Sequence, residues 1–188
     1  SSNAVELLFF TDRQQVYKTR ASEFDDTKAS LLGDYIPAKL SFDPDEKIVA
    51  LVTTRDYSGN LLFFFENGRA AKVPLASYET KTRRRRLSNA YCGKFPLVWM
   101  TAAAEDGEYI LSASGRRKLL LDTAMVLPKA ARDTQGIQVM ALKKNQTVES
   151  VTPFNGENLS NPQRFRPKSL PSAGALAHDE EEHTQLSL

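Results

Sequence analysis

NLLFFFENGRAAKVP, residues 60–74, decides the fold, because two apolar runs in it flank Asn67-Gly68. Both turn residues tolerate the positive φ that a two-residue type I′ turn needs, so the stretch predicts a β-hairpin. LLFFTDRQQVYK at residues 7–18 and YILSASGRRKLL at residues 109–120 share this shape. Recurrence at intervals of roughly 50 residues is typical of propellers and solenoids. The sequence therefore predicts an all-β array of about three units.

Each predicted unit consists of a hairpin, a long polar loop and a closing strand. The units cover about residues 5–59, 60–107 and 108–152. The closing strands are expected at residues 47–54, 97–103 and 137–142. Because a lone hairpin is marginal in water, neighbouring units must bury each other's apolar faces. Radial stacking around a centre achieves this and leaves only short sheet edges, so we expect a propeller-like architecture.

The two ends of the chain differ from the repeats. The opening SSNA, residues 1–4, resembles the remnant of a cleaved expression tag and is left out of the fold prediction. Residues 153–188 form a proline-containing tail with an acidic end, and two alternatives stay open for it. The tail is either a disordered terminus or an extended segment that packs along the repeats. The apolar residues available for such packing are Phe154, Phe165, Leu170 and Leu176.

Composition indicates a globular protein without a membrane span. Of the 188 residues 41% are apolar, enough for a sizeable core, but no apolar run approaches the ~18 residues of a spanning helix. The single Cys92 excludes an internal disulfide and favours a reducing, cytoplasmic setting. The net charge of +2 is uneven, because residues 151–188 carry three Lys/Arg against five Asp/Glu. That leaves 22 against 18, a net of +4, for the repeats.

The positive charges of the repeats fall in turns and inter-strand loops, which project from the rim of a radial array. They are Lys81, Arg83, Arg84, Arg85, Arg86 and Lys94 in or beside one loop, Arg116, Arg117 and Lys118 at a hairpin turn, Lys129 and Arg132 in a further loop, and Lys143 and Lys144 after a strand. A curved track of this kind suits the phosphates of double-stranded DNA. No base-reading helix is visible, so we expect phosphate contacts and specificity for shape. The alternative is that these loops are merely solvated.

Catalytic signatures are sparse. The only histidines, His178 and His183, lie in the tail, which excludes a Ser-His or Cys-His pair inside the repeats. Neither G-x-G-x-x-G nor G-x-x-x-x-G-K-[ST] occurs, so no phosphate-binding loop of these types is expected. Two other function classes stay open: a protein-interaction propeller without a nucleic-acid role, and an enzyme with carboxylates converging at a central channel.

FFENGRAAKVPL at residues 64–75, together with TQGIQVM at residues 134–140, resembles the C-terminal repeat domain of the A subunits of bacterial type IIA topoisomerases, DNA gyrase and topoisomerase IV. The resemblance covers about residues 5–150. It implies a β-pinwheel, a propeller-like disc whose blades exchange strands, which binds and bends double-stranded DNA along a basic rim. It also implies two partners, the remaining domains of the same polypeptide and the ATPase subunit of the enzyme. The cofactors ATP and Mg would belong to those parts, so no cofactor is expected in this segment.

The sequence departs from that family pattern in two ways. Three repeats are too few to close a disc, which implies a partial array from a longer polypeptide. The Gln-Arg-Arg-Gly-Gly-Lys-Gly box of DNA gyrase matches none of the loops at residues 27–33, 82–88 and 132–137. This favours a topoisomerase IV-like or weakly wrapping domain. None of the tyrosines matches the strand-cleaving site of the family, and we expect the acidic residues 179–182 to compete with DNA for the rim.

Overall fold

The computed structural model describes residues 4–24, 40–81 and 84–178, which form three four-stranded antiparallel sheets. The first sheet has the order β3 (Ile48–Thr54), β1 (Glu6–Thr11), β2 (Val16–Arg20) and β6 (Arg86–Leu87). The second has the order β7 (Leu97–Ala103), β4 (Asn60–Phe65), β5 (Arg69–Pro74) and β10 (Ile137–Gln138). The third has the order β11 (Val148–Pro153), β8 (Glu108–Ala113), β9 (Arg117–Asp122) and β12 (Ala175–Leu176). The prediction of an all-β array with three units is confirmed.

Each unit repeats the same hairpin in the same register. The outer pairs are Glu6 with Arg20, Asn60 with Pro74, and Glu108 with Asp122, so each hairpin spans the same number of residues. A 3-10 turn follows each hairpin: η1 (Ala21–Phe24), η2 (Leu75–Tyr78) and η3 (Thr123–Met125), with η4 (Pro162–Phe165) in the tail.

The turn type at Asn67-Gly68 differs from the prediction. The loop has three residues, 66–68; the Gly68 N–H donates to the Phe65 carbonyl, and only Gly68, with φ of 85°, takes a left-handed conformation there. This is a turn followed by a left-handed residue, not the two-residue type I′ turn, which needs positive φ at both positions. The equivalent third positions in the other two hairpins, Gln14 and Arg116, also have positive φ.

The outermost strand of each sheet is donated by the chain segment that follows it. β6 comes from the second unit but pairs with β2, β10 comes from the third unit but pairs with β5, and β12 comes from the tail but pairs with β9. The closing strand predicted at residues 137–142 is therefore wrong, because its first two residues form β10 on the second sheet. The third sheet is closed by β11, paired with β8.

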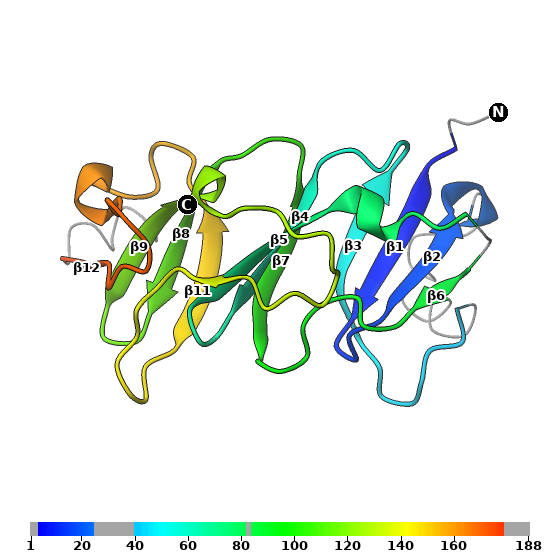
Figure 1. Ribbon diagram of the computed structural model, residues 1–188, viewed down its shortest axis with the longest axis horizontal. Coiled ribbons are helices and arrows are strands. Elements are labelled where there is room, and N and C mark those ends of the chain that lie inside the picture. Colours follow the sequence, from blue (N-terminus) through cyan, green and yellow to red (C-terminus); the bar gives the residue numbers. More distant parts are fainter. Residues whose placement is uncertain (1–3, 25–39, 82–83, 179–188) are drawn as a thin grey trace.

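The sheets converge at one edge and diverge at the other (Figure 1). β7 contacts both β3 and β11, so these three strands form the convergent side, which we call the hub edge. The donated strands β6, β10 and β12 lie at the opposite edges, which we call the rim. Because each sheet runs from hub edge to rim, anything carried by the donated strands faces outward around the array.

Four apolar clusters stabilise this arrangement. One fills the space between the first and second sheets, around Leu8, Phe63 and Tyr78, and another joins the second and third sheets, around Phe64 and Leu121. The outer face of the first sheet packs against Leu40 and Phe42. The outer face of the third packs against tail residues Phe154, Leu159 and Phe165. Residues 153–178 thus follow the packed alternative for the tail, although the Leu176 side chain itself is exposed.

Candidate nucleic-acid interface

Each donated strand is preceded by a segment that runs along the rim, and we call these the lead-in segments. They comprise residues 79–85, of which 82 and 83 lie outside the described ranges, then residues 126–136 and residues 166–174. Glycines fix where two of them enter their sheets. Gly136, with φ of 66°, lies so close to β5 that a Cβ there would be 2.0 Å from the Ala70 carbonyl oxygen, and Gly174 approaches the Lys118 carbonyl in the same way. Close backbone approach of this kind requires glycine.

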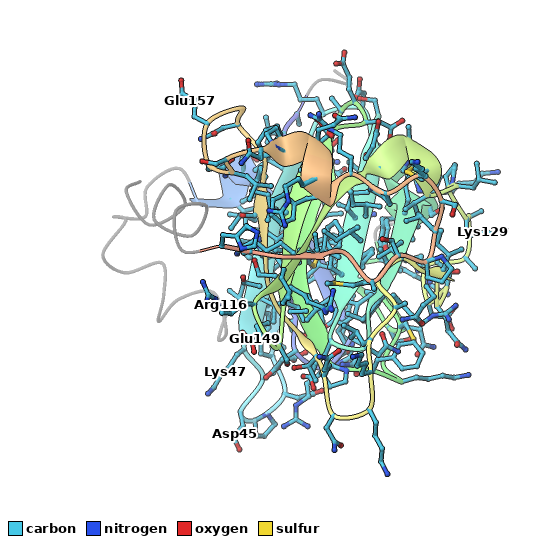
Figure 2. The ribbon with its side chains drawn as sticks, turned by 90° about the vertical axis from the view of Figure 1, so that its left-hand side faces the viewer. Asp45, Lys47, Arg116, Lys129, Glu149 and Glu157 are labelled. Atoms are coloured by element: carbon cyan, nitrogen blue, oxygen red, sulfur yellow. The ribbon has the colours of Figure 1, made fainter. Side chains whose placement is uncertain are left out.

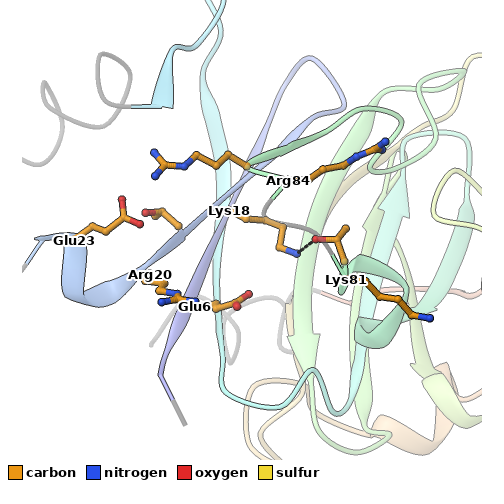
Figure 3. Close-up of a pocket in the computed structure, with 9 residues that line it drawn as sticks. Glu6, Lys18, Arg20, Glu23, Lys81 and Arg84 are labelled. Carbon is orange, nitrogen blue, oxygen red and sulfur yellow. Dashed lines mark hydrogen bonds between the residues drawn. The ribbon is translucent and has the colours of Figure 1, made fainter. Parts of the chain in front are cut away.

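The first lead-in segment and the strands β1 and β2 of the first sheet line a basic groove (Figure 3). The cations lining it are Lys18, Arg20, Lys81, Arg84 and Arg85, and the acids are Glu6 and Glu23. Arg20, Lys81, Arg84 and Arg85 are exposed. Figure 3 shows Arg84 and Lys81 extending away from Glu6 and Glu23. The groove therefore presents an excess of positive charge to solvent.

Lys18 has a structural role in this groove. Its ammonium is buried, donates to the Tyr78 carbonyl at 2.9 Å and to Thr80 Oγ1 at 3.0 Å, and lies 5.2 Å from the centre of the Tyr57 ring. Burial lowers the pKa of this lysine. The Tyr57 hydroxyl donates to Glu6, so that carboxylate is also engaged within the protein. These contacts join the first sheet to the start of the lead-in segment and help to position the exposed arginines.

The second lead-in segment carries Lys129 and Arg132. The Lys129 N–H donates to the Lys72 carbonyl, which ties the segment to β5, and the Lys129 side chain is exposed. Arg132 is half-buried and donates from Nη1 to the Ser77 carbonyl at 3.1 Å, beside a hollow that Asp133 also lines. Lys72 is buried and pairs with Asp106 at 2.6 Å, which holds the pKa of that carboxyl below its usual value.

The remaining residues that were predicted to bind DNA lie outside the groove and outside the second lead-in segment. Arg86, on β6, is 3.8 Å from Asp43, and Lys94 is exposed beside a groove at the hub edge. Lys118 is buried and donates to Ser112 Oγ at 2.8 Å. Figure 2 places Arg116, at the hairpin turn, on the opposite side from Lys129. Arg117 is half-buried, Lys143 and Lys144 are exposed in the turn before β11, and Arg83 lies outside the described residues.

Sequence reasoning missed the cations of the third lead-in segment and of the turn before it. Arg166 pairs with both oxygens of Glu108, at 2.7 and 3.0 Å, while Arg164 donates to the Leu176 carbonyl and Lys168 is exposed. A repeated signal was present: TQGIQV at residues 134–139 corresponds to SAGALA at residues 172–177. In both, a hydroxyl accepts from the glycine N–H, Thr134 from Gly136 and Ser172 from Gly174. The prolines around this second copy argued against a strand there, so the sequence analysis did not predict one.

The hub edge is apolar where the rim is basic. Ile48, Val49 and Leu51 on β3 are 41%, 44% and 52% exposed, large values for aliphatic side chains. Val49 also lines a groove with Val98 and Trp99 of β7. Contiguous exposed apolar surface is typical of sites that bind another molecule.

The described part of the chain shows neither a cluster of three metal-ligating residues nor a membrane-spanning helix. No three His, Cys, Asp or Glu residues gather there in a way that suits a metal ion. Nor does any helix within those residues have the length and apolarity to cross a membrane.

Comparison with protein families and known proteins identifies related sequences. The model of the "DNA gyrase C-terminal domain, beta-propeller" family matches residues 6–55 and 127–155. The A subunit of DNA gyrase from Helicobacter pylori is 30% identical over 109 residues, which cover 57% of this chain and 12% of that protein. The corresponding gyrase polypeptide of Mycolicibacterium smegmatis is 24% identical over 148 residues, or 77% of this chain and 18% of that protein. The chain thus spans less than a fifth of the length of these relatives.

Solved structures share the fold. The C-terminal domain of DNA topoisomerase IV superimposes with a TM-score of 0.72 at 20% identity, covering 93% of this chain and 58% of the other. The E. coli ParC C-terminal domain gives a TM-score of 0.64 at 9% identity, covering 98% and 76%. The strand-exchanged sheets, the family match and these relatives agree with one another. The chain therefore has the fold of the C-terminal domains of DNA topoisomerase IV and ParC, and its sequence is similar to the C-terminal domain of the A subunit of DNA gyrase.

Proposed function

We propose that this domain binds double-stranded DNA along its rim and bends it. In the whole enzyme the bent segment is presented to the cleavage core formed by the remaining domains of the same polypeptide, and the ATPase subunit drives strand passage. The chemistry, with its ATP and Mg, belongs to those other parts. This domain contributes the path that the DNA follows.

The observation that carries the proposal is the placement of exposed cations on successive lead-in segments. Lys81, Arg84 and Arg85 lie on the first and Lys129 on the second, and both segments run along diverging sheet edges. A polyanion that touches both must follow a curved path, since the sheets fan out from the hub edge. Asp106 is matched internally by Lys72. The exposed acids Glu79 and Asp133 offset part of the charge, which leaves a net of +2 on the described residues of the first segment and +1 on the second.

Fluorescence anisotropy with a mixed-sequence duplex tests the proposal. About five phosphate contacts give a slope of log affinity against log salt near −4.5. Replacing both Arg84 and Arg85 with alanine is expected to weaken binding at low salt and to reduce that slope by about 2. The double variant Lys143→Ala, Lys144→Ala is the matched control, because these exposed lysines lie in the turn before the hub-edge strand β11. Absent or salt-independent binding of the unaltered chain would refute the proposal.

The degree of wrapping is a finer part of the proposal. The segments 84–88 and 132–137 lack the gyrase box, and residues 27–33 lie outside the described ranges. We therefore expect a topoisomerase IV-like or weakly wrapping domain. A topology assay of relaxed plasmid closed by ligase in the presence of the protein would measure this, and a strong change in linking number would contradict it.

A second candidate function is a protein interface at the hub edge, favoured by the exposed Ile48, Val49 and Leu51. The arginine double variant separates the two functions. If a partner protein is retained by that variant as well as by the unaltered chain, and DNA is bound by neither, the protein-interaction function is the correct one.

A further inference from the structure

We propose that the tail is itself a DNA-contacting element, which extends the basic rim onto the third sheet through Lys168. This inference rests on the proposed function. Net charge alone suggests the opposite, since residues 151–188 are net negative. Four of the five acids, however, fall at residues 179–182, outside the described part of the tail. Residues 153–178 contain Arg164, Arg166 and Lys168 against Glu157 alone, a net of +2.

The first step of the argument is that the tail takes the place of a further repeat unit. Val16, Ala70 and Lys118 occupy the same position in their hairpins, ten residues after the first residue of β1, β4 and β8. Their partners on the donated strands are Leu87, Ile137 and Ala175, respectively. The tail strand therefore meets its sheet in the same register as the strands donated by true repeats, and its lead-in segment lies at the corresponding place on the rim.

The second step is that each lead-in segment carries an exposed lysine at a similar place. Lys81, Lys129 and Lys168 lie six, eight and seven residues before Leu87, Ile137 and Ala175, and all three side chains are exposed. Because the three sheets diverge toward the rim, lysines in equivalent positions mark three successive points on one curve. Phosphates follow one another along a duplex, so each point can be met by the same DNA molecule.

The third step is that the lead-in segment of the tail is held firmly, so its lysine is presented from a fixed backbone. At its start Arg166 pairs with Glu108 and also donates to Gln163 at 2.7 Å. Toward its end the Ser172 N–H donates to the Val139 carbonyl, and the Ala141 N–H donates to the Ser172 carbonyl. The pairing of Arg166 also neutralises Glu108, an acid that would otherwise repel phosphate at this part of the rim.

The test compares single lysine variants of the 188-residue chain by anisotropy titration with one labelled mixed-sequence duplex of about 40 base pairs, long enough to span several turns. Lys168→Ala is expected to lower affinity about fivefold to tenfold near 0.1 M salt and to reduce the salt slope by about 1. Lys129→Ala is expected to lower the affinity and the salt slope by similar amounts. Lys47→Ala is the matched control, because Figure 2 shows Lys47 on the side opposite Lys129.

The outcomes separate the two proposals. If Lys129→Ala weakens binding while Lys168→Ala matches Lys47→Ala, the tail makes no contact and this inference is overturned, although DNA binding by the rim stands. If the unaltered chain does not bind the duplex, both proposals fail. Circular dichroism melting of each variant confirms that the substitutions leave the fold intact; a Lys168→Ala chain that melts like the unaltered chain and binds more weakly supports the inference.

Discussion

Glu46 ties the segment just before β3 to the first sheet. It is buried, and its carboxylate accepts from Thr11 Oγ1 at 2.5 Å, Gln15 Nε2 at 3.0 Å, the Tyr17 hydroxyl at 2.6 Å and the Asp43 N–H at 2.9 Å. Burial and the hydrogen bond to Glu46 raise the pKa of Tyr17 to about 12, so the phenol stays a donor well into the alkaline range. The carboxylate thereby joins the loop before β3 to the first sheet.

Replacing Glu46 with alanine is expected to lower the free energy of unfolding by about 2–4 kcal/mol, because several buried donors lose a charged acceptor at once. Urea unfolding measures the change. Glu149→Ala on β11 is the control: that side chain is exposed, so its loss should shift stability by no more than about 0.5 kcal/mol. Equal stability of the two variants would show that the Glu46 hydrogen bonds contribute nothing net.

At the scale of elements, local sequence predicts strands well and their partners poorly. The hairpins at residues 7–18, 60–74 and 109–120 follow from apolar runs and turn residues, which act over a few positions. Ile137 and Gln138 alternate as a strand should, but nothing local says which sheet receives them. Strand exchange is decided by contacts distant in sequence. The same limit explains why the donated strand of the tail was missed among its prolines.

The candidate site shows the same division. Loop position predicted that Lys81, Arg84, Arg85 and Lys129 are exposed, since turns and loops project from sheets. Loop position did not predict that Lys118 is buried against Ser112, because that burial depends on the neighbouring strands and on β12. Whether a cation faces solvent is set by packing, which a charge count along the chain does not contain.

The entry of β10 into the second sheet depends on Gly136, and this can be tested by substitution. Alanine there would combine a φ of 66° with a Cβ 2.0 Å from the Ala70 carbonyl oxygen. We expect Gly136→Ala to cost more than about 2 kcal/mol in urea unfolding. Gly156→Ala is the matched control, since φ is 90° there but no atom lies within 4 Å, so only the backbone cost of about 1 kcal/mol applies.

Hydrogen exchange locates that effect. The Val139 N–H donates to the Gly68 carbonyl just beyond β10, so its exchange should accelerate in Gly136→Ala and not in Gly156→Ala. If both variants lose the same stability, the close approach of Gly136 to β5 is not what holds the donated strand.

The whole molecule is an array with covered ends and uneven charge. Leu40 and Phe42 cover the outer face of the first sheet, and the tail covers that of the third. The described part of the tail adds positive charge, whereas residues 179–188 contain four acids and no lysine or arginine. Removing those ten residues therefore changes the net charge from +2 to +6. Long-range attraction of a polyanion depends on such a total as well as on individual contacts.

A chain ending at His178 is accordingly expected to bind duplex DNA more tightly than the full chain at low salt, with the difference shrinking as salt rises, because salt screens interactions between exposed charges. Anisotropy titration at several salt concentrations measures this. A full-length variant with Asp179 changed to Asn and Glu180, Glu181 and Glu182 changed to Gln removes the same charge and keeps the length. Equal gains in DNA affinity by the two variants assign the effect to charge. A gain on truncation alone assigns it to the bulk of the terminus. If neither variant gains affinity, the acidic end does not compete with DNA.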